Sequence, residues 1–214
     1  MRLLAIGLNP VLQKTLIFDQ LRLGKVNRAR ECHLTAGGKG IHFARAAHAL
    51  AAGSATVAHF LGGQNGAWVD DTLKREGIPQ LSVATPGETR ICTTLLSRAD
   101  QTMTELIDPS PAIPATAADD MTAQLLASLP GLAGLAFCGT FPPGIQASLY
   151  SELAAKRGRA LLLLDAYKEI HGVLEAASVD ILKINVDEAL ELTGATTPQA
   201  AAAEVRRRWR VDCL

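Results

Sequence analysis

The chain has 214 residues, of which 48% are hydrophobic and 20% are charged, and its formal net charge is zero. A chain of this length and composition can bury a full core, as one large domain or as one domain with a small appendage. A net charge of zero argues against nucleic-acid and membrane partners. No apolar run approaches the roughly 18 residues of a membrane span.

The four cysteines Cys32, Cys92, Cys138 and Cys213 lie far apart in the sequence and form no C-x-x-C pair. The N-terminus shows no charged region followed by a long apolar stretch. These features predict free thiols in a reducing cytoplasm and no secretory leader. The histidines show no metal-ligand spacing with cysteines or acidic residues, so no zinc site is expected.

Short apolar runs alternate with amphipathic segments along most of the chain. Strands are predicted at residues 2–8, 55–61, 135–139, 160–164 and 179–184, and helices at 41–52, 67–76, 118–129, 146–157, 187–192 and 198–209. This alternation is typical of right-handed βαβ units. It predicts an α/β fold with a mostly parallel sheet that is covered on both faces.

Two segments interrupt this alternation. Residues 89–97 and 102–107 are rich in Thr, Ile and Leu and alternate with period two, which predicts a β-hairpin. Residues 15–18 and 27–34 also have an extended pattern and could join the hairpin in a small separate sheet. Such a sheet with one apolar face either closes over a ligand or packs against a second copy of the chain. A plain surface hairpin is the alternative.

A glycine cluster around one lysine, Gly37-Gly38-Lys39-Gly40, stands directly before the predicted helix at 41–52. Glycines let the backbone approach a ligand and turn amide groups inward, and the start of a helix adds a partial positive charge. The pattern favours a cradle for an anion, although short glycine runs also occur in ordinary tight turns.

Several motifs occur in the order seen in the ribokinase-like (PfkB) sugar kinases. They are Leu8-Asn9-Pro10, Gly37-Gly38-Lys39-Gly40, Thr89-Arg90, Gly139-Thr140-Phe141-Pro142-Pro143-Gly144 and Lys183-Ile184-Asn185-Val186-Asp187-Glu188. The chain therefore resembles this family over its whole length, and most of all the branch that phosphorylates fructose 1-phosphate or tagatose 6-phosphate. The resemblance implies a ribokinase-like three-layer sandwich, with one kinase domain over residues 1–214 and a β-sheet lid formed by segments at about 12–34 and 88–108.

The resemblance also implies a sugar-phosphate site. In the family the glycine-lysine segment binds the sugar, which here means Gly38, Lys39 and Gly40. Arg90 resembles the arginine that reaches the phosphate already present on the substrate, and a guanidinium offers a planar fork that fits a phosphate. Thr140 takes the place of a family serine near the substrate, although a turn with two prolines and two glycines is rigid without any ligand.

Two positions that read sugar hydroxyls in the family differ in this chain. Gln13 stands three residues after the Asn9-Pro10 pair, where the family usually has an aspartate, and His42 stands where it commonly has an asparagine. An amide still donates and accepts hydrogen bonds but carries no charge. Asn9, Gln13 and His42 belong to the implied substrate site, and the identity of the sugar stays open.

Lys183, Asn185 and Glu188 match the Lys-x-Asn-x-x-Glu segment of the family, which serves the nucleotide. The resemblance implies ATP and Mg²⁺ as cofactors, with Glu188 on the metal side. A carboxylate and an amide can hold the hydration shell of Mg²⁺, which keeps several waters. The same residues also fit a strand-to-helix cap, with Asn185 or Asp187 as the capping residue, and both roles can hold at once.

The catalytic segment of the family, Asp-Thr-x-Gly-Ala-Gly-Asp, does not occur before Leu214. With it the general-base aspartate and the anion hole are missing, so no catalytic residue is assigned. Because phosphoryl transfer depends on positioning and charge stabilisation, the chain is expected to be the first two-thirds of a kinase, C-terminally incomplete and inactive by itself.

The implied reaction transfers the γ-phosphoryl group of ATP to a hydroxyl of a sugar phosphate, in a cytoplasmic homodimer joined through the lid. One alternative is a kinase of the same fold for nucleosides or other small alcohols, against which Arg90 argues because such substrates carry no phosphate. Another is a degenerate sugar-phosphate binder without catalysis. A dinucleotide-binding oxidoreductase is disfavoured because no G-x-G-x-x-G follows the first strand.

Overall fold

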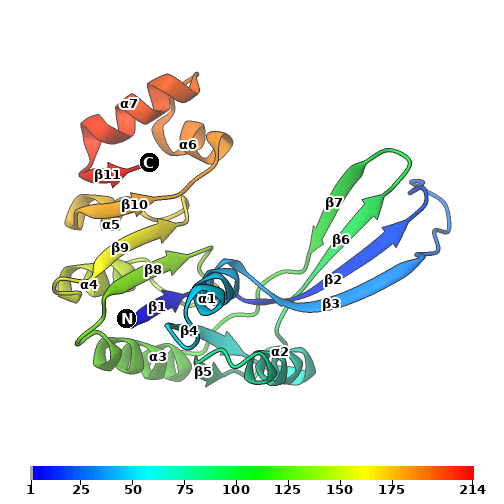
Figure 1. Cartoon of the computed structure of the whole chain (residues 1–214), viewed down its shortest axis with the longest axis horizontal. Helices are drawn as coiled ribbons and strands as arrows, with labels where there is room; N and C mark the ends of the chain where they lie inside the picture. Colours follow the sequence, from blue (N-terminus) through cyan, green and yellow to red (C-terminus); the bar gives the residue numbers. More distant parts are fainter. Residues whose placement is uncertain (1) are drawn as a thin grey trace.

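A computed structural model describes residues 2–214, which form two separate sheets (Figure 1). The larger sheet consists of β1 Leu3–Ile6, β4 Ala55–Leu61, β5 Gln80–Ala84, β8 Gly134–Cys138, β9 Leu161–Asp165, β10 Val179–Leu182 and β11 Val211–Cys213. Its strand order is β11-β10-β9-β8-β1-β4-β5, and its paired strands run parallel. The predicted α/β fold with a parallel sheet is confirmed.

Helices form a layer on each face of this sheet, each around its own apolar core. One core holds residues of α1 Lys39–Leu50 and α2 Gly63–Arg75. The other holds residues of α3 Ala115–Ser128, α4 Ser148–Lys156, α5 His171–Ala176, α6 Val186–Thr193 and α7 Pro198–Arg208. On β9 and β10 the side chains of Leu161 and Ile181 are 59% and 39% exposed. Coverage of both faces is therefore only partial at that end of the sheet.

The small sheet projects from the larger one (Figure 1) and has the strand order β3-β2-β6-β7. Its strands are β2 Val11–Phe18, β3 Glu31–Gly37, β6 Ile91–Ser97 and β7 Thr102–Ile107. The hairpin of β6 and β7 is confirmed, and so is its union with the two earlier extended segments through the parallel pairing of β2 with β6. All six residues of the edge strand β7 are exposed.

Some local predictions were wrong. The edge strand β5 was not predicted, since only Val83 in it is buried and no clear alternation results. The helix α5 was also missed because its six residues are too few for a helical period to show. The strand β3 extends to Gly37, which pairs with Val11, so the first glycine of the cluster ends a strand. The helix α2 begins at Gly63 rather than at residue 67. Glycine has a low helix propensity, so no sequence pattern indicated this earlier start.

Arg206, Arg207 and Arg208 lie in the final turn of α7, where positive charge complements the helix dipole. The short strand β11 follows α7 and pairs in parallel with β10. Within residues 2–214, no helix is long and apolar enough to cross a membrane.

His59 is a fully buried histidine on β4. Its Nε2 atom lies 2.9 Å from Ser82 Oγ and 3.1 Å from Gln80 Oε1, and its Nδ1 atom has no hydrogen-bond partner among residues 2–214. Burial lowers the pKa of His59 to about 4, and the Gln80 hydrogen bond and the Asp70 charge offset only part of this effect. The fold therefore holds the neutral imidazole.

We expect the free energy of unfolding to fall as the pH is lowered from about 6.5 to 4. In that window the unfolded chain takes up a proton at the imidazole while the folded chain does not, so the stabilisation present above pH 6.5 is lost towards pH 4. The loss due to His59 is on the order of 3 kcal/mol. Urea denaturation of the parent and of His59→Gln at several pH values measures it.

The difference between the two proteins at pH 7.5, where the imidazole is neutral in both states, gives the packing cost of the substitution. After that cost is subtracted, His59→Gln is expected to lose less stability towards pH 4 than the parent does. Parallel pH profiles for the two proteins would contradict the role of His59.

Candidate active site

A cavity of about 370 Å³ lies between the carboxyl end of β1, the start of α1 and the small sheet. Its wall contains all the predicted substrate-binding residues except Gly40, namely Asn9, Gln13, Gly38, Lys39, His42, Arg90 and Thr140. These residues come from segments that are far apart in the sequence. The cavity is therefore the place where the predicted substrate site assembles.

Two glycines set the start of α1 against the end of β1. A Cβ atom on Gly40 would lie 2.7 Å from the Cα atom of Gly7, so the two backbones are in direct contact. Gly38 is the N-cap residue and has a φ angle of 114°, which residues with side chains rarely adopt. No side chain caps α1, so its first amide groups remain available to an anion. Gly40 thus contributes through close packing and does not line the cavity.

Asn9 ties several parts of the cavity wall together. Its Nδ2 atom donates to Thr140 Oγ1 at 3.1 Å, its Oδ1 atom accepts from Ser110 Oγ at 3.0 Å, and its backbone oxygen accepts from Arg90 Nη2 at 3.1 Å. The side chain of Asn9 is therefore engaged with the protein itself. In this structure it positions Thr140 and Arg90.

Arg90 is a half-buried cation whose hydrogen bonds are incomplete. Its Nε atom is buried and has no acceptor among residues 2–214, and none of the ion pairs of these residues involves its guanidinium. Burial lowers the pKa of Arg90 from its usual value, against an opposing effect of Cys92. A buried cation without a counterion is costly, so this guanidinium suits an anionic ligand.

His42 lines the cavity from the first turn of α1. Burial and, to a lesser degree, the charge of Arg45 lower the pKa of His42. This shift favours the neutral imidazole, which offers one donor and one acceptor to a ligand.

Lys39 joins the substrate cavity to the segment predicted to serve the nucleotide. Its Nζ atom lies 3.1 Å from Asp165 Oδ1 and 3.5 Å from Glu188 Oε1. Partial burial alone would lower the pKa of Lys39, but the hydrogen bond to Asp165 and the charges of Asp165 and Glu188 outweigh it and raise the pKa. Lys183 approaches the same Asp165 oxygen at 3.2 Å. Two ammonium groups thus share one carboxylate.

The helix-cap interpretation of Asn185 and Glu188 is confirmed. Asn185 Oδ1 accepts from the backbone nitrogen of Glu188 at 2.8 Å, and Glu188 Oε2 accepts from the backbone nitrogen of Asn185 at 3.0 Å. This capping box leaves Glu188 Oε1 facing Lys39. The cap holds the carboxylate at the edge of the site.

Sequence reasoning missed two acidic residues of this region. Asp165 is the last residue of β9, and an acidic residue at the carboxyl end of a buried parallel strand is a signal that could have revealed it. Glu105 lines the cavity from β7. It is the charged residue in the otherwise uncharged run 102–107. The alternation of this run did not indicate which residues of the cavity wall lie beside it.

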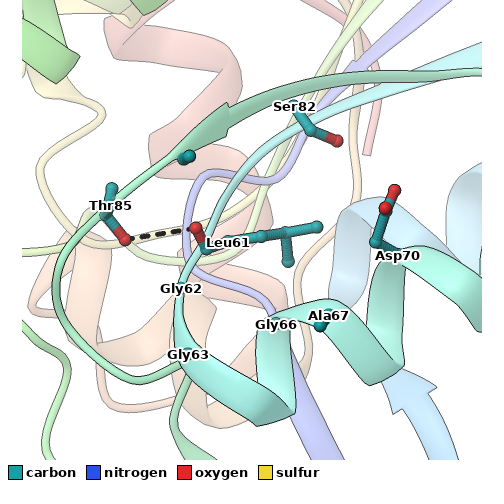
Figure 2. A pocket seen from close by; sticks show the side chains of 9 residues that line it. Leu61, Gly62, Gly63, Gly66, Ala67, Asp70, Ser82 and Thr85 are labelled. Carbon is teal, nitrogen blue, oxygen red and sulfur yellow. Dashed lines mark hydrogen bonds between the residues drawn. The ribbon is translucent and has the colours of Figure 1, made fainter.

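A second hollow, of about 310 Å³, lies between the carboxyl ends of β4 and β5 and the helix α2 (Figure 2). Asp70, Ser82 and Thr85 are its polar residues, and Asp70 pairs with Lys74 while Thr85 donates to the backbone oxygen of Leu61. None of the predicted site residues lines this hollow. Among the described residues that line it there is no cationic side chain for a phosphorylated ligand, whereas Lys39 and Arg90 line the first cavity.

The profile of the pfkB family carbohydrate kinases matches residues 8–208. The chain belongs to this family. It is 30% identical over 213 residues to the 1-phosphofructokinase of Rhodobacter capsulatus, a match covering 96% of this chain and 67% of that protein. It is 28% identical over 195 residues to the tagatose-6-phosphate kinase of Staphylococcus epidermidis, a match covering 89% of this chain and 62% of that protein.

Among solved structures, the phosphofructokinase-2 of Escherichia coli in complex with fructose-6-phosphate has the same fold, with a TM-score of 0.86 and 23% identity. The match covers 98% of this chain and 71% of that chain. The present chain thus spans about two-thirds of the length of the relatives that it matches.

The Gly7–Gly40 contact leads to a stability prediction. We expect Gly40→Ala to lower the free energy of unfolding by about 1 to 3 kcal/mol, because the new methyl group meets backbone atoms that cannot turn away. Gly172→Ala in α5 is the matched control, since its Cβ would meet only the movable Ser151 hydroxyl. Chemical denaturation measures both. Equal stability of the two variants would show that the strand and the helix can separate without cost.

Proposed function

We propose that the protein of which these residues are part is an ATP-dependent kinase for a sugar phosphate of the fructose 1-phosphate or tagatose 6-phosphate type. The names of the two curated relatives support this substrate class. The observation that carries the proposal is Arg90, a half-buried guanidinium that lines the cavity and whose Nε atom has no acceptor among the described residues. A phosphate on the substrate would provide that acceptor.

The roles of the other site residues follow from their places in the wall. Lys39 and the free amides of α1 would attract anionic oxygens, His42 and Gln13 would bind hydroxyl groups, and Asn9 would hold Thr140 and Arg90 in position. The small sheet would act as the lid of the cavity, with lid segments at about 12–34 and 88–108 of a single kinase domain.

The residues near Lys39 fit a nucleotide with a hydrated magnesium ion. Asp165 and Glu188 both face the Lys39 ammonium, which shows that positive charge is accommodated there. Mg²⁺ needs only one or two carboxylates when phosphates and waters complete its shell. Glu188 would bind the hydrated magnesium ion, and Lys183 and Asn185 would lie near the phosphates of the nucleotide. The bound ion would neutralise charge on the transferring phosphoryl group.

We propose that residues 1–214 alone bind ligand without turnover, since the catalytic aspartate segment does not occur in them. The four cysteines carry free thiols. This state suits a reducing cytoplasm, where we propose that the protein works.

Arg90→Ala is expected to weaken the binding of fructose 1-phosphate or tagatose 6-phosphate by about 1.5 to 3 kcal/mol, or roughly ten- to a hundredfold. The reason is that the phosphate loses a charge-assisted partner. Binding of unphosphorylated fructose should stay unchanged. Isothermal titration calorimetry with each ligand measures the difference between the phosphorylated and the plain sugar.

Arg98→Ala is the matched control, because Arg98 lies in the turn between β6 and β7 and pairs with Glu31 outside the cavity. It should leave both affinities unchanged. If Arg90→Ala binds both kinds of sugar as the parent does, the phosphate contact does not exist and an unphosphorylated substrate becomes the better interpretation.

We further propose that two copies of the chain associate through the small sheet. Met103, Leu106 and Ile107 on the edge strand β7 are more than half exposed, and Leu34 on the other edge strand is 45% exposed. A small sheet with two open edges and exposed apolar side chains is marginal alone. A second copy would cover these side chains.

At micromolar concentration, light scattering is expected to give twice the mass of one chain. Met103→Asp should shift the protein towards the monomer, because it places a charge in the covered apolar surface. Leu50→Asp is the control, since Leu50 is 89% exposed at the end of α1, away from the small sheet. A parent protein that is monomeric under these conditions would refute the association.

A further inference from the structure

The wall of the substrate cavity contains one carboxylate with no assigned role. Among the residues 2–214 that form this wall, Glu105 alone carries a carboxylate, and it shares the wall with Gln13 and Arg90. A sugar phosphate has an anionic end and several hydroxyl groups. A carboxylate repels the first and accepts hydrogen bonds from the second. The position of Glu105 therefore bears on the orientation of the bound ligand.

The strand register separates Glu105 from Arg90. Glu105 pairs with Thr94, which lies four residues beyond Arg90 on the same extended segment. Four residues of extended chain span about 13 Å along the backbone, and Cys92 and Thr94 within β6 point to the same face. The backbone position of Arg90 is thus separated from that of Glu105 by roughly the length of a sugar. The cavity has a cationic end and an anionic end.

A chain of hydrogen bonds orients Glu105. Gln13 Nε2 donates to Thr94 Oγ1 at 2.6 Å, and Thr94 Oγ1 donates to Glu105 Oε1 at 3.4 Å. Because the amide of Gln13 occupies a lone pair of the hydroxyl, the hydroxyl proton can turn to Glu105. In the hydrogen bonds of residues 2–214 only Oε1 of Glu105 takes part, so Oε2 remains for a ligand.

Gln13 lines the cavity together with Glu105 but carries no charge of its own. Its amide nitrogen is already bonded to Thr94. Glu105 lies two strands further along on the same face, since β2 pairs with β6 and β6 pairs with β7. The negative charge of this face is thus carried by Glu105, which is linked to Gln13 through Thr94.

We propose that Glu105 is the residue that binds the hydroxyl groups of the sugar phosphate in this protein, with Thr94 and Gln13 as its positioning residues. This inference rests on the proposed function. The ligand then lies with its phosphate at Arg90 and its hydroxyl-bearing end at Glu105. The carboxylate accepts hydrogen bonds from the hydroxyls, and no bond is made or broken.

The test compares Glu105→Gln with the parent in calorimetric titrations of fructose 1-phosphate, tagatose 6-phosphate and inorganic phosphate. Inorganic phosphate has no sugar hydroxyls, so it reports the cationic end alone. Glu105→Gln is expected to lower the affinity for at least one sugar phosphate tenfold or more. Its affinity for inorganic phosphate should stay within about twofold of the parent or rise, since a repelling charge is removed.

Two further variants separate this role from a structural one. Gln13→Asp in the Glu105→Gln background should recover part of the lost affinity, because it restores a carboxylate on the same face. Glu31→Gln is the matched control on the small sheet, outside the cavity wall, and should leave all three affinities unchanged. Thermal unfolding of each variant checks that the fold is kept.

The outcomes separate the role of Glu105 from the proposed kinase function. If the parent binds a sugar phosphate and Glu105→Gln binds it equally well, the role of Glu105 is overturned and the proposed function stands. Equal losses for sugar phosphate and inorganic phosphate would also overturn it, since no hydroxyl would be read. If the parent binds inorganic phosphate but neither sugar phosphate, the proposed function and this inference both fail.

Discussion

The contact between Gly7 and Gly40 is the constraint on which the site depends. It brings the start of α1 against the carboxyl end of β1, with no room for a single methyl group between the two backbones. The uncapped amides of α1 then open on the cavity, and Lys39 can reach Asp165 at the end of β9. A wider separation of strand and helix would move the lysine away from both carboxylates. The site is thus a consequence of backbone packing.

Charge is distributed over the site in three groups, each held by a different part of the fold. Arg90 lines the cavity from the segment directly before β6 and Glu105 lines it from β7, while Lys39 contacts the carboxylates of Asp165 and Glu188. Each group is fixed by hydrogen bonds to the protein, through Asn9, Thr94 and the capping box. Such fixed charges need little rearrangement when a charged ligand enters.

Sequence patterns predicted the strands β1, β4, β8, β9 and β10 because buried parallel strands appear as continuous apolar runs. They also predicted the hairpin, whose alternation is local. The strand β5 and the helix α5 were missed, because a partly exposed edge strand and a six-residue helix carry almost no periodic signal. The motifs singled out Lys39 and Arg90, since glycine neighbours and a family pattern mark them within a few residues.

The sequence by itself determined the fold class, the order of the motifs and the residue types that could bind a phosphorylated sugar, because periodicity and spacing are properties of short segments. Only the tertiary structure decided that Asp165 joins Lys39 to Lys183, that Gly40 packs against Gly7, and that Glu105 is linked to Gln13 through Thr94. The contacts that link them span from 11 residues, between Thr94 and Glu105, to 81 residues, between Gln13 and Thr94, and more. Their meeting depends on strand order and register, which set the distances between side chains and leave no local trace in the sequence.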